Sequence, residues 1–134
     1  MTSPKFGPVG QPPKLPNGGV APLSPAFATD DLIFMSGQLP FRGDGSLDTG
    51  SIESQTAQCL ANIEGFLKDL GLTKADIVKA TVWLTDVADF AGFNSVYANF
   101  FEGTFPARST VRSDLMLPGA KVEIEVIVSK RNSV

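Results

Sequence analysis

The chain contains no histidine and a single cysteine, Cys59, and these two shortages exclude several common kinds of active site. Ser-His-Asp triads and Cys-His dyads need an imidazole, and the usual zinc sites combine cysteine with histidine. One cysteine cannot form an internal disulfide. Cys59 falls inside a predicted helix, where we expect a buried, inert thiol. Any chemistry must therefore do without imidazole, and we expect no metal site.

The sequence also has few basic residues and no long hydrophobic run. Lysine and arginine total 11 against 14 acidic residues, giving a net charge of −3. A protein that binds the phosphate backbone usually carries a basic stripe, so the composition argues against nucleic acid as a partner. No apolar segment is long enough to span a membrane, and the N-terminus lacks the apolar core of a signal peptide. We expect a soluble cytoplasmic protein.

What the sequence does contain is enough for one folded domain. The chain has 134 residues, 43% of them hydrophobic, with 10 phenylalanines. Proline and glycine are concentrated in residues 1–19, which predicts a flexible N-terminal arm. The single domain is then expected over residues 20–134.

Hydrophobic periodicity gives the order of elements in that domain. Helical spacing over residues 52–70 predicts a helix capped by Ser51 and ended by Gly71. A second helix is expected from Asp86 or Asp89, with an aromatic stripe that includes Tyr97. Strands are predicted as a hairpin around residues 30–31, and then over residues 78–84, 108–113 and 121–128.

This order predicts an α+β fold with both helices on one face of a mixed sheet. The alternation over residues 78–84 places Val78, Ala80, Val82 and Leu84 on one face. The face without helices carries too many apolar groups to meet water alone, so we expect the protein to form oligomers.

Two residues stand out as candidates for chemistry on a small acid. Arg108 is always charged, and its planar fork of donors matches a carboxylate. Pro106, two positions earlier, restrains the backbone and gives Arg108 a defined direction. Glu123 can position water or move a proton. A surface ion pair is the more usual role of an isolated arginine such as Arg108, and Glu123 fits a solvated strand face about equally well.

Four further residues are weaker candidates. Ser36 and Gly37 end an apolar strand, where a glycine allows a ligand to approach the backbone or simply makes a turn. Asn94 lies early in the second helix, a position that is more often only solvated. Glu125 shares a strand face with Glu123 and fits a solvated role.

Several segments together resemble the RidA (YjgF-type) family of reactive-intermediate deaminases. The segments are LIFMSGQ (residues 32–38), VKATVWLTD (78–86), FPARST (105–110) and VEIE (122–125), and the resemblance spans about 105 residues in the same order. It implies a chorismate-mutase-like fold and a homotrimer with pockets between subunits. It also implies hydrolysis of amino-acid-derived enamines or imines to 2-oxo acids and ammonia, without a cofactor.

The resemblance also assigns roles to individual residues. Arg108 matches the arginine that binds the substrate carboxylate, and Glu123 matches the glutamate that orients the attacking water. Ser36, Gly37 and Asn94 match positions in or near the pocket. Thr110 matches a position whose main-chain carbonyl helps to hold water or ligand.

One position departs from the family pattern. Leu23 stands where the family often has a tyrosine, which makes the pocket more apolar and leaves the substrate open. Three alternatives therefore stay beside a general imine deaminase. They are a non-catalytic binder of small carboxylates such as 2-oxo acids, a deaminase dedicated to one catabolic substrate, and, against the acidic composition, a ribonuclease.

Overall fold

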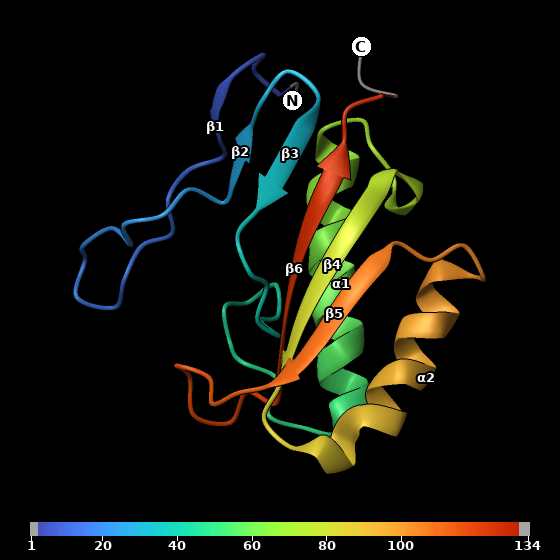
Figure 1. The fold of residues 1–134 in the computed structure, drawn as a ribbon. Coiled ribbons are helices and arrows are strands. Elements are labelled where there is room, and N and C mark those ends of the chain that lie inside the picture. Colours follow the sequence, from blue (N-terminus) through green and yellow to red (C-terminus); the bar gives the residue numbers. More distant parts are fainter. Residues whose placement is uncertain (1–2, 132–134) are drawn as a thin grey trace.

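A mixed six-stranded sheet carries two helices on one of its faces, as Figure 1 shows. The computed structural model describes residues 3–131, and the strand order is β1-β2-β3-β6-β4-β5. Only β4 and β5 pair in parallel, and every other neighbouring pair is antiparallel. The strands are β1 (Gly7–Val9), β2 (Ala26–Ala28), β3 (Leu32–Met35), β4 (Ile77–Leu84), β5 (Ala107–Arg112) and β6 (Val122–Ser129).

The two helices are the crossover connections of this sheet. Helix α1 (Ile52–Asp69) joins β3 to β4, and helix α2 (Phe90–Phe101) joins β4 to β5. Strands β3 and β4 both run antiparallel to β6, which lies between them, so they are parallel to each other. Parallel strands are joined with a right-handed crossover, which puts both helices on the same side. The predicted α+β architecture is confirmed.

Helix α1 follows its sequence signals closely. The side chain of Ser51 accepts a hydrogen bond from the amide of Ser54 at 3.1 Å and so caps the first turn. Gly71, with a φ of 75°, allows the left-handed turn that ends the helix. The buried stripe lies on the sheet and includes Cys59, Leu60, Ile63 and Leu67. The predicted range of residues 52–70 is correct to within one residue.

The sequence did not predict strand β1, which lies inside the Pro/Gly-rich segment. It pairs antiparallel with β2 and buries Val9, while the ring of Phe6 packs edge-on against Phe27 at 5.1 Å. Pro8 is tolerated because β1 is an edge strand, where one missing donor costs no ladder bond. The segment before residue 20 is therefore anchored to the sheet at this point.

The prediction that Val78 shares a buried face with Ala80 is wrong. Ile77 lies opposite Val128 and Lys79 lies opposite Ile127, so one residue of β4 is extra at Val78. A β-bulge of this kind shifts the side-chain alternation by one position. Val78 is 44% exposed, whereas Ile77 takes the buried position in its place.

The second helix begins later than one of its two predicted starts. Asp86 caps a short 3₁₀ turn over Val87–Asp89, accepting a hydrogen bond from the amide of Ala88 at 2.8 Å, and α2 follows from Phe90. The aromatic stripe on α2 then faces the sheet and buries Phe93, Tyr97 and Phe101.

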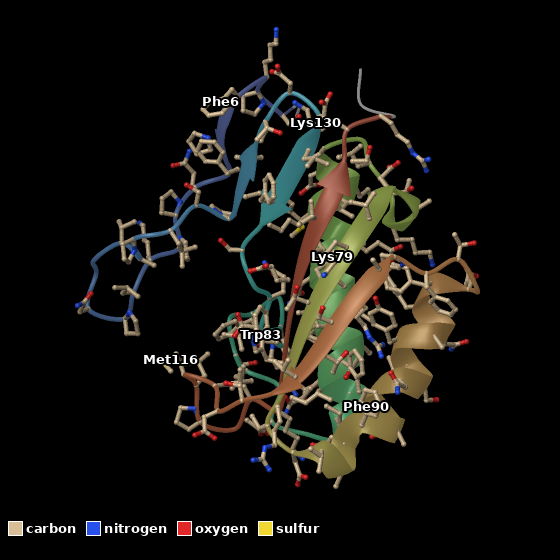
Figure 2. All side chains as sticks on the ribbon, in the orientation of Figure 1. Phe6, Lys79, Trp83, Phe90, Met116 and Lys130 are labelled. Atoms are coloured by element: carbon tan, nitrogen blue, oxygen red, sulfur yellow. The ribbon has the colours of Figure 1, made fainter. Side chains whose placement is uncertain are left out.

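The face of the sheet opposite the helices is uncovered and partly apolar. Figure 2 shows Lys79 and Trp83 on β4 pointing away from α1 and α2. On the same face Phe27, Phe34 and Val111 are 39%, 41% and 48% exposed. Within residues 3–131, neither helix is both long and apolar enough to cross a membrane.

Candidate functional site

A bulge at the end of β3 brings a glycine against Glu123. Phe34 lies opposite Ile127 and Gln38 lies opposite Ile124, so three residues of one segment face two residues of β6. Bulges often re-aim side chains next to active sites. A Cβ added to Gly37 would overlap the Glu123 carboxylate, so only glycine leaves this carboxylate where it is.

The backbone around the bulge is fixed by short polar contacts. The hydroxyl of Ser36 donates to the carbonyl of Ser24 at 2.6 Å, and the Ser36 amide donates to the carbonyl of Pro25 at 2.9 Å. Both contacts fasten the segment containing Leu23 beside the end of β3. A pocket of about 640 Å³ lies here and is lined in part by Leu23, Ser36, Gly37 and Glu123.

Glu123 is half-buried in this pocket, and the described part of the chain gives it no cationic partner. Burial raises the pKa of the Glu123 carboxyl, and the nearby charge of Glu125 raises that pKa further. Among residues 3–131, no lysine or arginine lies within ion-pair distance of Glu123. A carboxylate in this setting is suited to accept a proton or to hold a water molecule.

Arg108 lies on the opposite face of the sheet from Glu123. In the parallel pairing of β4 and β5, Arg108 is opposite Ala80, which faces the helices. In the pairing of β4 and β6, Glu123 is opposite Trp83, which faces away from them. Since side chains alternate along a strand, one chain presents these two groups on separate surfaces.

Three aromatic rings of α2 surround the Arg108 guanidinium. Its central carbon lies 4.8 Å from the ring centre of Tyr97, 5.3 Å from that of Phe93 and 5.9 Å from that of Phe90. Cation–π contacts of this length hold the side chain in place without neutralising it. No carboxylate of the described residues lies within ion-pair distance of Arg108. Its charge is therefore available to an anion.

Two small hollows lie along β5, and Arg108 lines one of them. One, of about 300 Å³, is lined by Asn94, Tyr97 and Arg108 together with Phe105 and Pro106. The other, of about 220 Å³, is lined in part by Phe90 and Thr110. Phe90 is visible at the start of α2 in Figure 2.

Two hydroxyl groups near Arg108 are buried without a hydrogen-bond partner in the described part of the chain, those of Tyr97 and Thr110. Burial of an unpaired hydroxyl is unfavourable, and such groups are often kept for a ligand or a bound water. Burial also raises the pKa of the Tyr97 phenol, while the charge of Arg108 opposes that rise, so Tyr97 is a neutral hydroxyl at neutral pH.

The predicted site residues thus form two groups. Leu23, Ser36, Gly37 and Glu123 line one pocket, and Asn94 and Arg108 line another, with Thr110 in the adjoining hollow. Sequence reasoning assigned Tyr97 only to an apolar stripe. The signal that marks it is the spacing of that stripe, which places an aromatic ring opposite the strand that holds Arg108.

Sequence reasoning also missed part of the Glu123 pocket. Gln11 and Pro13 reach it from the segment that follows β1, and Phe41, Asn62 and Met116 reach it from other elements. Met116 stands on the loop after β5 in Figure 2. These residues come from distant parts of the chain, and no local pattern marks them.

Neither a thiol nor a metal cluster completes the site within residues 3–131. Cys59 is buried and its Sγ lies 3.4 Å from the carbonyl oxygen of Gln38. Burial raises the pKa of the Cys59 thiol strongly, which makes it a poor nucleophile, as the sequence predicted. No group of three or more cysteine, aspartate or glutamate side chains in this range is arranged to hold a metal ion.

Comparisons with known proteins give a consistent result. The model of the family described as Endoribonuclease L-PSP matches residues 17–130. A RutC family protein, y4sK of Sinorhizobium fredii, is 41% identical over 113 residues, which cover 84% of this chain and 90% of the relative. The 2-iminobutanoate/2-iminopropanoate deaminase of Capra hircus is 38% identical over 109 residues, which cover 81% of this chain and 80% of the relative.

A solved structure supports the same relationship. The crystal structure of the YjgF gene product from E. coli superposes with a TM-score of 0.79 at 32% sequence identity, covering 96% of this chain and 100% of that chain. The family fold expected from the sequence is therefore confirmed.

Proposed function

Because the chain belongs to the RidA/YjgF family, also described as endoribonuclease L-PSP, we propose that it hydrolyses imines of small 2-oxo acids, releasing ammonia. Relatives that carry the name 2-iminobutanoate/2-iminopropanoate deaminase support this reaction. The observation that carries the proposal is that Arg108 and Glu123, each lining its own pocket, have no opposite charge within ion-pair distance among residues 3–131.

Arg108 would bind the carboxylate of the imine. A guanidinium offers two parallel N–H donors to a carboxylate, and charge-assisted bonds of this type contribute about 1.5–3 kcal/mol each. The three rings of α2 restrict the guanidinium before the substrate arrives, so little side-chain freedom is lost on binding. Asn94 lines the same hollow as Arg108, and Thr110 lies two residues along β5 on the same strand face as Arg108.

Glu123 would hold and activate the attacking water. The water oxygen adds to the carbon of the C=N bond while one of its protons passes to Glu123, and Glu123 delivers that proton to the imine nitrogen, which gives a carbinolamine. Glu123 then takes the proton of the carbinolamine hydroxyl group and passes it to the amine nitrogen, as the C=O bond forms, the C–N bond breaks and ammonia leaves. The chain contributes position and electrostatics to these steps, without a covalent intermediate.

The two charges meet only if two copies of the chain meet. Arg108 and Glu123 lie on opposite faces of one sheet, so a single chain cannot place both against one small molecule. Arg108 and Glu123 would meet in an assembly of two copies. In it, the β5 edge of one copy would present its helix-side surface to the open sheet face of the next copy. We propose a homotrimer with such pockets between subunits, and the exposed Phe34 and Val111 supply apolar surface for that contact.

The test is clearance of 2-iminobutanoate generated in situ by a threonine dehydratase. We expect Arg108→Ala to reduce kcat/KM at least about a hundredfold, as loss of a charged carboxylate contact implies. Arg108→Lys should recover only part of this, because the ammonium keeps the charge but loses the planar fork. Lys68→Ala removes an exposed cation of α1 and serves as the control.

Two results would contradict the proposal. Wild-type clearance by Arg108→Ala would remove the arginine from the mechanism. Tight binding of 2-oxobutanoate by the wild-type protein with no acceleration of imine hydrolysis would instead identify a carboxylate-binding protein without catalysis.

A further inference from the structure

The pocket beside Glu123 combines polar and apolar lining residues. Glu123 and Glu125 line it from β6. Its apolar lining includes Leu23, Phe41 and Met116, which are 46%, 40% and 91% exposed. Leu39 and Pro13 add to this apolar wall, which consists of hydrocarbon and thioether groups.

Two of the polar residues that line the pocket, Ser36 and Asn62, already donate side-chain hydrogen bonds to the protein. The Ser36 hydroxyl donates to the carbonyl of Ser24. The amide of Asn62 donates to the carbonyl of Phe41 at 2.8 Å and of Leu39 at 3.4 Å, and its oxygen accepts from Gln58 at 2.9 Å. Neither residue keeps its donor free to recognise a polar group on a substrate, whereas burial of an apolar group there is favourable.

The pocket is also large for a four-carbon acid. Its volume of about 640 Å³ falls in the range of roughly 300–1,000 Å³ that drug-sized ligands occupy. A substrate with a one- or two-carbon side chain would leave the apolar wall in contact with water. A larger apolar side chain would cover that wall and gain about fourfold in affinity for each buried methylene group.

We propose that this protein prefers imines of 2-oxo acids with a branched, thioether or aromatic side chain, and that Leu23 and Met116 set this preference. The inference rests on the proposed function, since it assumes that the imine carbon lies at Glu123 and the carboxylate at Arg108. The wall formed by Leu23, Phe41 and Met116 lines the same pocket as Glu123, so it is the apolar surface that this chain offers to the substrate side chain.

The test compares four imines generated in situ by an L-amino-acid oxidase from alanine, leucine, methionine and phenylalanine, with semicarbazide competing for each. We expect kcat/KM for the leucine and methionine imines to exceed that for the alanine imine at least about tenfold, from two or more additional buried carbons. The fall in semicarbazone formation measures each rate.

Two variants locate the preference. Leu23→Ser and Met116→Ser should each lower the ratio of kcat/KM for the leucine imine to kcat/KM for the alanine imine about tenfold. Leu15→Ser is the matched control, because Leu15 is 41% exposed in the same N-terminal segment but does not line the pocket.

The outcomes separate this inference from the proposed function. If the alanine imine is hydrolysed as fast as the leucine imine or faster, the inference is wrong and the deaminase activity stands. If no imine is hydrolysed faster than in buffer, the deaminase activity itself is wrong. If Leu15→Ser and Leu23→Ser act alike, the preference does not arise from the pocket wall.

Discussion

Two effects act in the same direction on the pKa of Glu123. Burial raises its pKa, and the charge of Glu125, two residues away on the same strand face, raises it further. A carboxyl group whose pKa is higher in the folded state opposes folding when it ionises. This effect is absent at pH below the unfolded pKa and grows as the pH rises through the folded pKa. The site therefore keeps a carboxyl group that is useful for proton transfer at some expense in stability.

Replacing the neighbouring charge should move the pH dependence of the reaction. With Glu125→Gln, one cause of the raised Glu123 pKa is removed, so Glu123 ionises at lower pH. Since the proposed base must be ionised, we expect the acidic limb of the kcat/KM profile to move to lower pH, measured between about pH 4 and 8.

The same variant should also change the pH dependence of stability. Because ionised Glu123 opposes folding less when its folded-state pKa is lower, the free energy of unfolding at neutral pH, relative to that at low pH, should be higher in Glu125→Gln than in the wild type. Glu64→Gln, which removes an exposed carboxylate from α1, should leave the limb in place. If the acidic limb of Glu125→Gln keeps its position or moves to higher pH, Glu123 is not the group that titrates.

Individual residues of the site could be predicted from the sequence, but their grouping could not. Arg108 and Glu123 were recognisable from the FPARST and VEIE segments. Which face of the sheet each occupies depends on the register of β5 and β6 against β4, and such pairing is set by contacts far apart in the chain. The bulge that brings Gly37 against Glu123 also depends on distant pairing, because its extra residue is recognised only when the segment is aligned with β6.

At the scale of elements, the packing of the two helices depends on a close approach at Gly92. A Cβ added there would lie 2.7 Å from an oxygen of Glu53 and 2.8 Å from a methyl carbon of Ile52, both on α1. Gly65, on the exposed side of α1, would meet nothing within 4 Å. The same substitution should therefore have opposite effects at the two positions.

We expect Gly92→Ala to destabilise the fold by about 1–3 kcal/mol, because overlap with α1 outweighs the better helix propensity of alanine. Gly65→Ala should stabilise it by about 0.5–1 kcal/mol, since only the propensity changes. Urea unfolding followed by circular dichroism at one fixed protein concentration measures both values. Equal gains for the two variants would mean that the helices move apart without cost.

Long periodic elements were predictable, and short or irregular ones were not. Helix α1 has 18 residues, a capping serine and a terminal glycine, so local signals agree along its whole length. Strand β1 has three residues, one of them proline, and exists because β2 offers it a partner. Val78 looked like a core residue by alternation, and only the pairing with β6 reveals the bulge that exposes it.

At the scale of the whole molecule, the site is divided between two surfaces of one chain. The Arg108 side lies between β5 and α2, and the Glu123 side lies on the open face of the sheet. In a cyclic trimer each copy would give its Arg108 to one pocket and its Glu123 to another. Assembly and catalysis would then be inseparable, and a monomeric variant would lose activity while keeping its fold.

This division predicts that two inactive variants restore one another. Arg108→Ala and Glu123→Gln should each be inactive alone, and both should keep the mass of a trimer in light scattering. When they are refolded together at equal amounts, some pockets receive Arg108 from one chain and Glu123 from its neighbour. With random mixing, roughly a quarter of the pockets combine an intact Arg108 with an intact Glu123. We therefore expect roughly a quarter of wild-type activity.

The matched control mixes the same two proteins without unfolding, so that chains do not exchange, and it should stay inactive. If both groups of each pocket came from one chain, no mixed assembly would contain an intact pocket and refolding would restore nothing. Recovery therefore requires that Arg108 and Glu123 act across a subunit boundary, which follows from their places on opposite faces of the sheet.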